Sequence, residues 1–197
     1  AGNVIYLNND GIICEAKKSS IKINITTEKP KTVAFDTKEN EVVYNDDVEF
    51  NIDVKDEATK DKNDKEVYSG IKEIKYEVYS SESPEGADGN VNGTISFEPS
   101  DRVQRHNIPN LKIPVKEQSR YNSNDVTIKV TVIDNAGNQS ISTKKIKIDT
   151  TKPTIDVSYD NNEVANESYF KKDRVMTIKY TERNIKPEGD SEEYTSY

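Results

Sequence analysis

One short segment rich in Gly and Asn has residues that could hold a metal ion. Residues 88–95 match the opening of a calcium-binding loop, in which oxygen ligands alternate along the chain and a Gly permits the turn. Asp88, Asn90 and Asn92 occupy the ligand positions, but Pro99 stands where the template needs a bidentate acid. The segment therefore offers calcium a weak site, and an ordinary hairpin turn accounts for the same residues.

A second candidate cation site comes from acidic residues at the predicted ends of strands. Asp56 follows one strand and Asp134 follows another, and we expect both to approach a linker that carries Glu28. Carboxylate oxygens are the ligands that calcium prefers, so a cation there would stiffen a junction between domains. Turn capping by Asp and Asn side chains is the alternative.

A small basic cluster stands out in an acidic chain. It consists of Arg102, Arg105 and His106, with Tyr121 further along. Because Arg and Tyr are frequent at binding hot spots, this cluster is a candidate contact for an anionic glycan or an acidic patch on a host protein. The alternative is that the basic side chains lie over a loop and form surface ion pairs of little consequence, for example with Asp101.

Composition argues against an enzyme. One His and one Cys in 197 residues leave neither a His-rich zinc site nor an intramolecular disulfide, and a nucleophilic triad only if His106 were its base. The net charge of -8 disfavours nucleic acid as a partner. No apolar run reaches the roughly 18 residues of a membrane helix, so we expect no membrane insertion. We also expect no cofactor, calcium excepted.

These residues must be positioned by strands, because 20 Ile and 17 Val against 2 Leu favour β-structure over helix. Apolar and polar residues alternate over several stretches, as in half-buried strands. The predicted strands are Val48–Val54, Ile74–Val78, Val126–Val132 and one around Ile146 and Ile148, with shorter ones at Thr32–Phe35, Thr94–Phe97 and Lys112–Val115. About seven strands suit an all-β, immunoglobulin-like sandwich.

Two regions interrupt the alternation. Asp56–Glu66 is nearly all charged or polar and is predicted to be a solvated loop. Residues 80–124 are rich in Ser, Gly, Asn and Pro and are predicted to form a long excursion. We expect any specific recognition to lie in that excursion.

Internal repetition sets the predicted domain boundaries. Ala-Gly-Asn occurs at residues 1–3 and 136–138, and Lys-Pro pairs at residues 29 and 152 lie 123 positions apart. We therefore predict final strands of a preceding repeat in 1–29, a complete domain in 30–151, and opening strands of a following repeat in 152–197, with a frayed end at Lys186–Tyr197. The incomplete units leave unpaired edges, so strand-swapped self-association is expected to be available to the chain.

The chain resembles the tandem immunoglobulin-like repeats of large cell-surface, adhesin-type proteins of Gram-positive Firmicutes. The segments that carry the resemblance are Ser69–Tyr76, Val126–Asn138, Ile148–Pro153, Ile155–Tyr159, Tyr169–Lys172 and Thr181–Asn184. The resemblance implies an extracellular, non-catalytic stalk repeat, with neighbouring repeats as partners, that extends and presents a distal adhesive region.

Two other functions remain open at this stage. The domain could be a module that binds a host glycan or protein, such as a mucin, a matrix protein or an immunoglobulin, through residues 80–124. It could also be an accessory sandwich of a secreted carbohydrate-active enzyme. A sandwich fold alone does not choose among them.

Overall fold

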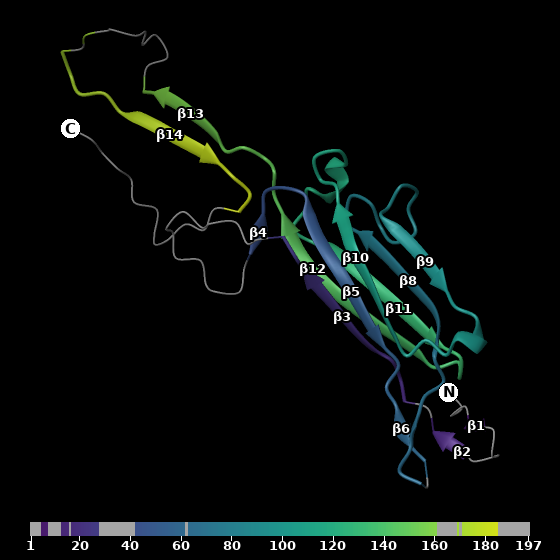
Figure 1. The fold of residues 1–197 in the computed structure, drawn as a ribbon. Coiled ribbons are helices and arrows are strands. Elements are labelled where there is room, and N and C mark those ends of the chain that lie inside the picture. The colour runs from purple at the N-terminus through teal and green to yellow at the C-terminus, as the bar shows by residue number, and fades with distance from the viewer. Residues whose placement is uncertain are drawn as a thin grey trace.

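The computed structural model describes residues 5–7, 13–15, 17–27, 42–61, 63–160, 169 and 171–184. Strands dominate this part of the chain (Figure 1), and its helical elements are two short 3-10 turns, η1 (Pro99–Asp101) and η2 (Ser119–Tyr121). Within the described ranges, no helix is long and apolar enough to cross a membrane. The predicted all-β fold is confirmed. The predicted strand Thr32–Phe35 and the predicted frayed end Lys186–Tyr197 lie outside the described residues.

One sheet of the central sandwich has three antiparallel strands. In order across the sheet they are β10 (Arg105–Ile113), β5 (Val48–Lys55) and β3 (Ser20–Ile25). The predicted alternation holds in β5, where Val48, Phe50, Ile52 and Val54 are all fully buried.

The other sheet has five strands. In order they are β4 (Val43–Tyr44), β12 (Gln139–Ile148), β11 (Val126–Asp134), β8 (Ile71–Tyr79) and β9 (Asn92–Ser96). All neighbours are antiparallel except β4, which pairs in parallel with the end of β12. The predicted turn after β11 is present, since Asp134 accepts hydrogen bonds from Asn138 and the chain returns directly into β12.

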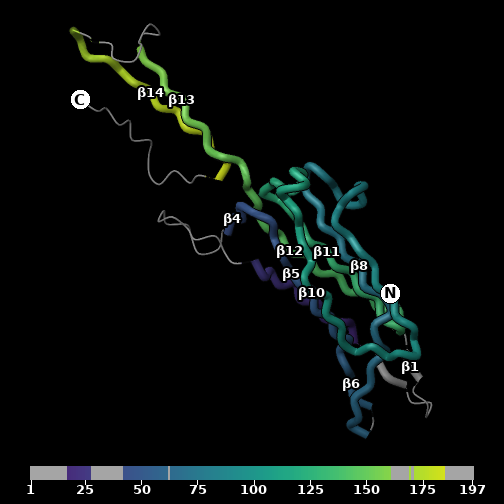
Figure 2. Tube along the Cα trace, turned by 45° about the horizontal axis from the view of Figure 1, so that its top comes forward, coloured from purple at the N-terminus to yellow at the C-terminus, as the bar shows by residue number. Residues whose placement is uncertain are grey.

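The two sheets lie face to face and enclose the core (Figures 1 and 2). The core side chains are mainly Val and Ile from both sheets, and residues such as Ile52, Ile74, Ile128 and Val130 are 0% exposed. Burying each such side chain stabilises the fold by about 1.5–3 kcal/mol. This strand order, with β3 at the edge of one sheet and β4 beside β12, the last strand of the other, is that of an immunoglobulin-like sandwich.

Three small hairpins flank the sandwich. They are β1 (Ile5–Leu7) with β2 (Ile13–Glu15), β6 (Thr59–Lys60) with β7 (Glu66–Val67), and β13 (Thr154–Tyr159) with β14 (Met176–Thr181). The β13–β14 hairpin projects from one end of the sandwich, whereas β1, β2 and β6 lie near the other end (Figures 1 and 2). The predicted loop Asp56–Glu66 thus contains β6 and opens with a buried residue, because Asp56 is 1% exposed.

Residues 80–124 are more regular than the predicted excursion. They contain β9 and the whole of β10, which begins at Arg105 and so is longer than the predicted strand Lys112–Val115. The register of β10 against β5 shifts between Ile108 and Leu111, where Asn110 has a φ of 57°. This bulge breaks the period-2 pattern that reveals a strand in the sequence.

The start of the central domain also differs from the predicted boundary at residue 30. Strand β3, which that boundary assigned to a preceding repeat, pairs with β5, and its Ile23 belongs to the central core. The antiparallel pairs β3–β5 and β13–β14 have the same register. In each pair the first residue of the earlier strand lies opposite the last residue of the later strand, Ser20 opposite Lys55 and Thr154 opposite Thr181. Ser20 and Thr154 lie 134 positions apart (154 minus 20), close to the spacing of the Ala-Gly-Asn segments but not of the Lys-Pro pairs.

Candidate functional site

The densest cluster of polar contacts between separate units lies where the central sandwich meets the β13–β14 hairpin. Strand β12 ends at Ile148, whose N–H donates to the Ser123 carbonyl at 2.8 Å. The next residue, Asp149, is 8% exposed, and its N–H donates to the Tyr44 carbonyl at 2.7 Å. Its Oδ1 accepts the Thr151 N–H at 3.0 Å, an Asx-type turn that starts the linker to β13.

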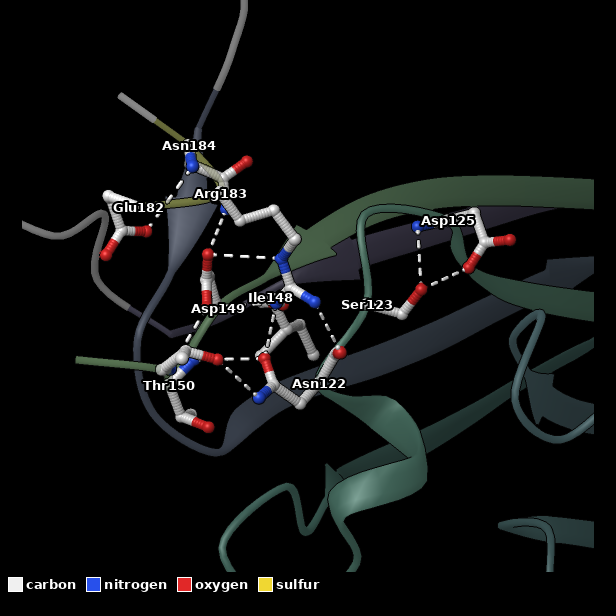
Figure 3. Close-up of polar contacts among 10 residues, drawn as sticks. Asn122, Ser123, Asp125, Ile148, Asp149, Thr150, Glu182, Arg183 and Asn184 are labelled. Atoms are coloured by element: carbon white, nitrogen blue, oxygen red, sulfur yellow. Dashed lines mark hydrogen bonds and ion pairs between the residues drawn. The ribbon is translucent and has the colours of Figure 1, made fainter. Parts of the chain in front are cut away.

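Arg183, just after β14, reaches back from the hairpin onto this turn (Figure 3). Its Nε donates to Asp149 Oδ2 at 3.2 Å, and its Nη2 lies 2.9 Å from Asp149 Oδ1. The two contacts form the forked pair that a guanidinium and a carboxylate prefer. The neighbouring Asn184 donates its side-chain amide to the same carboxylate.

The remaining guanidinium donors bind the end of η2. Arg183 Nη1 donates to the Asn122 carbonyl at 3.0 Å and Nη2 to Asn122 Oδ1 at 2.5 Å, while Nη2 also reaches the Ile148 carbonyl at 3.1 Å. Asn122 is itself fixed by the linker, because its Oδ1 accepts the Thr150 N–H at 3.1 Å. One side chain of the hairpin thus contacts two separate segments of the sandwich.

The electrostatics of Asp149 agree with this geometry. Burial alone would raise the pKa of its carboxyl, but hydrogen bonds from Thr151 and Arg183 outweigh burial and hold the pKa below its ordinary value. The carboxylate therefore stays charged opposite the guanidinium. The ion pair and hydrogen bonds of this cluster join the hairpin to the sandwich.

The structure shows a compact turn at the predicted calcium loop. Asn90 is buried, and its Oδ1 accepts the Ser83 hydroxyl at 2.7 Å while its amide donates to Glu77 at 2.8 Å. Asn92 donates its amide to the Asn90 carbonyl, and the Asp88 carbonyl accepts Arg120 Nη1 at 2.8 Å. The side chains of Asn90 and Asn92 thus form hydrogen bonds within the turn, as the hairpin-turn alternative expects.

Asp56 and Asp134, which were predicted to approach a linker carrying Glu28, lie close enough for their charges to interact. Both are buried, at 1% and 0% exposure, and the charge of Asp134 acts on the Asp56 carboxyl. Glu28 lies outside the described residues. However, Thr27 contacts Glu49 near the start of β5, whereas Asp56 follows the other end of that strand, beside Ser20.

Tyr121 does not belong to the surface of the predicted basic cluster. Tyr121 is 0% exposed in the core, where its hydroxyl accepts the Val91 N–H at 2.7 Å and donates to the Val78 carbonyl at 3.3 Å. His106 packs edge-on against Phe97, with ring centroids 4.9 Å apart. Arg102 and Arg105 are exposed, but Arg105 lies in a strand, not in the predicted loop. Tyr121 therefore cannot share a surface patch with the other three.

A polar hollow of about 720 Å³ lies beside the junction. It is lined by Glu82 and Ser83 and by residues between Glu117 and Asn122, all within the predicted 80–124 region. Asn122 thus borders both the hollow and the Arg183 contact.

Sequence reasoning assigned no role to Arg183, because its partners Asp149 and Asn122 are 34 and 61 positions away. The available signal was indirect: Thr181–Asn184 is one of the segments that resemble repeat sequences. Comparison with known proteins adds no further identification, since no family model, curated protein or solved structure matches this chain.

Proposed function

We propose that this chain is a non-catalytic stalk segment of a bacterial cell-surface protein, in which sandwich domains are joined end to end to hold a distal binding region away from the cell. The observation that carries the proposal is the Arg183 contact, which joins consecutive units through a forked ion pair and three further hydrogen bonds. A flexible linker would need no such contact.

The position of the contact supports the same function. Only residues 149–153 separate β12 from β13, and they include Pro153, which restricts the backbone. The short linker limits the range of hinge angles, and Arg183 selects one orientation within that range. An ordered joint keeps successive domains extended.

The first prediction concerns the order of this joint. Spin labels on Thr143→Cys and Thr177→Cys, in a Cys14→Ser background, report the distance between sandwich and hairpin by pulsed electron resonance. We expect a narrow distance distribution that broadens at least twofold in Arg183→Gln. Arg183→Lys should broaden it as well, because an ammonium group cannot make the forked contact.

Arg174→Gln is the matched control, because Arg174 lies in the same hairpin segment and pairs with Asp160, which directly follows β13. Its distribution should stay as narrow as that of the parent. A parent distribution that is already broad, or one that Arg183→Gln leaves unchanged, would show that the joint is loose and would remove the support for a stalk.

A second function, binding of a host glycan or protein, is favoured by the polar hollow beside the junction. A glycan array, followed by a saturable binding curve for any sugar retained, tests it. Binding that disappears when Glu82 and Glu117 are both changed to Gln, but persists in Arg102→Gln, would make the chain a binding module.

A further inference from the structure

Two carboxylates are buried together at the end of the sandwich opposite the Arg183 contact. Asp56 follows the last residue of β5, and Asp134 is the last residue of β11. They are 1% and 0% exposed. Removing two negative charges from water is costly unless each is hydrogen-bonded and paired with positive charge.

The hydrogen bonds to this pair are incomplete. Asp56 Oδ2 accepts the Gly70 N–H at 2.6 Å and the Ser69 hydroxyl at 3.1 Å, but Asp56 Oδ1 is buried and has no hydrogen-bond partner among the described residues. Asp134 accepts both of its side-chain hydrogen bonds from Asn138. Every one of these donors is uncharged.

Neither carboxylate is paired with a basic side chain within the described part of the chain. No ion pair within the described part of the chain includes Asp56 or Asp134, although surface carboxylates such as Asp47 and Asp46 do pair with lysines. Burial raises the pKa of Asp56, and the Asp134 charge raises it further. The fold thus places two like charges side by side and leaves one buried oxygen without a donor.

We propose that Asp56 and Asp134 bind one divalent cation, Ca²⁺ being the ion that fits best. Its two positive charges match the two carboxylates, and the unpartnered Asp56 Oδ1 is the first ligand. The ligands are oxygens only, which suits calcium rather than a transition metal, and calcium accepts irregular geometry completed by backbone carbonyls and water.

This site goes beyond the stalk function and does not depend on it. Asp56 lies beside Ser20, where the chain enters the sandwich through β3. A bound cation would tie the end of β5 to the end of β11, and so join the two sheets at the entry point. The sandwich would then be more stable with calcium whatever the protein does.

The test is thermal unfolding of the whole chain at neutral pH, first in EDTA and then with increasing CaCl₂. We expect Tm to rise with calcium, by about 5–10 °C at a hundredfold excess over Kd, and to return to its starting value when EDTA is restored. Asp56→Asn keeps an oxygen to accept the Gly70 N–H but removes the charge, so it should abolish the calcium response. Asp88→Asn, in the other predicted loop, should keep it.

Two results would overturn the proposal. If Tm is the same in EDTA and in calcium, the two carboxylates share a proton instead of a cation. If Asp56→Asn folds and still responds, calcium binds elsewhere. If Asp56→Asn does not fold, Asp134→Asn takes its place and should likewise lose the calcium response. Tyr-sensitised terbium luminescence of the parent chain then reports directly whether the protein binds a calcium-like ion. The calcium site is tested by Tm and the stalk function by the spin-label distances, so either proposal can fail without the other.

Discussion

Asp149 and Asp56 show how one residue type takes opposite states at the two ends of a sandwich. Both are largely buried, at 8% and 1% exposure. Asp149 accepts hydrogen bonds from the Arg183 guanidinium and from the Thr151 N–H of the linker, so its pKa is lowered. Burial is the largest influence on the Asp56 carboxyl, its donors are neutral and its neighbour is a second carboxylate, so its pKa is raised. The sign of each shift depends on whether the hydrogen bonds and nearby positive charge outweigh burial, as they do at Asp149 and do not at Asp56.

Tyr121 supports a prediction about the core. Its hydroxyl accepts the only hydrogen bond that the Val91 N–H makes in the described structure, and Tyr121→Phe leaves that donor unpaired. We expect the free energy of unfolding, measured by urea titration, to fall by about 1–3 kcal/mol. Tyr44→Phe is the control, because the Tyr44 hydroxyl has no hydrogen bond to the described residues. Equal losses in the two variants would contradict the role given to the Tyr121 hydroxyl.

Strand β9 depends on a glycine facing an aromatic ring. Gly93 lies directly opposite Tyr76 on β8, and a Cβ at Gly93 would come within 2.6 Å of the Tyr76 ring. A contact that short cannot be accommodated without movement of the ring or of the strand. The Tyr76 side chain thus fills the space that glycine leaves, as aromatic residues do beside glycines in other sheets.

Gly93→Ala should therefore lower the free energy of unfolding by about 1–3 kcal/mol. The same substitution in a Tyr76→Val background should cost much less, because the ring is gone. A double-mutant cycle of the four proteins by urea titration measures the coupling. Additive effects would show that the ring moves aside freely and that the close approach has no energetic consequence.

The strands that could be predicted from sequence are those with one face buried throughout. In β5 and β11 the alternation of Val and Ile with polar residues fixes both the strand and its inner face. Strand β10 was only partly predicted, because its bulge at Ile108 interrupts the pattern. Strand β3 lies in residues 1–29, whose strands were predicted to belong to a preceding repeat, because the sequence pattern does not show which strand a segment pairs with.

The site could be predicted only in fragments for a similar reason. Asp56 and Asp134 could be assigned to one candidate site from the sequence, because both follow predicted strands. It could not bring Arg183 to Asp149, because that contact depends on how two units are oriented. It also placed Tyr121 on the surface, since nothing in the sequence shows that η2 turns this ring into the core.

At the scale of the whole molecule, the β13–β14 hairpin carries an apolar face that nothing in the described structure covers. Val157 and Ile178 are cross-strand partners and are 52% and 55% exposed, and Ile155 and Tyr180 are paired in the same way. In the corresponding pair β3–β5, the partner positions Ile23 and Ile52 are buried under the second sheet. The hairpin has the pattern of half a sandwich.

We therefore expect the chain to self-associate reversibly, with a mean mass that rises with concentration in multi-angle light scattering. Val157→Lys combined with Ile178→Glu places opposite charges across the hairpin and should shift the protein to monomer. Ile141→Thr, which removes an apolar side chain of similar exposure from the central sandwich, should not. Monomer at every concentration in the parent chain would contradict the expectation.

The positions of the two chain ends in the sandwich determine how it would respond to pulling. Strand β3 starts beside Lys55 and β12 finishes beside Tyr44, at opposite ends of the fold. Tension applied along the polypeptide would therefore run parallel to the strands. The interstrand hydrogen bonds would be loaded in shear and would resist together, instead of being peeled apart one at a time. A domain connected in this way is suited to carrying mechanical force without unravelling.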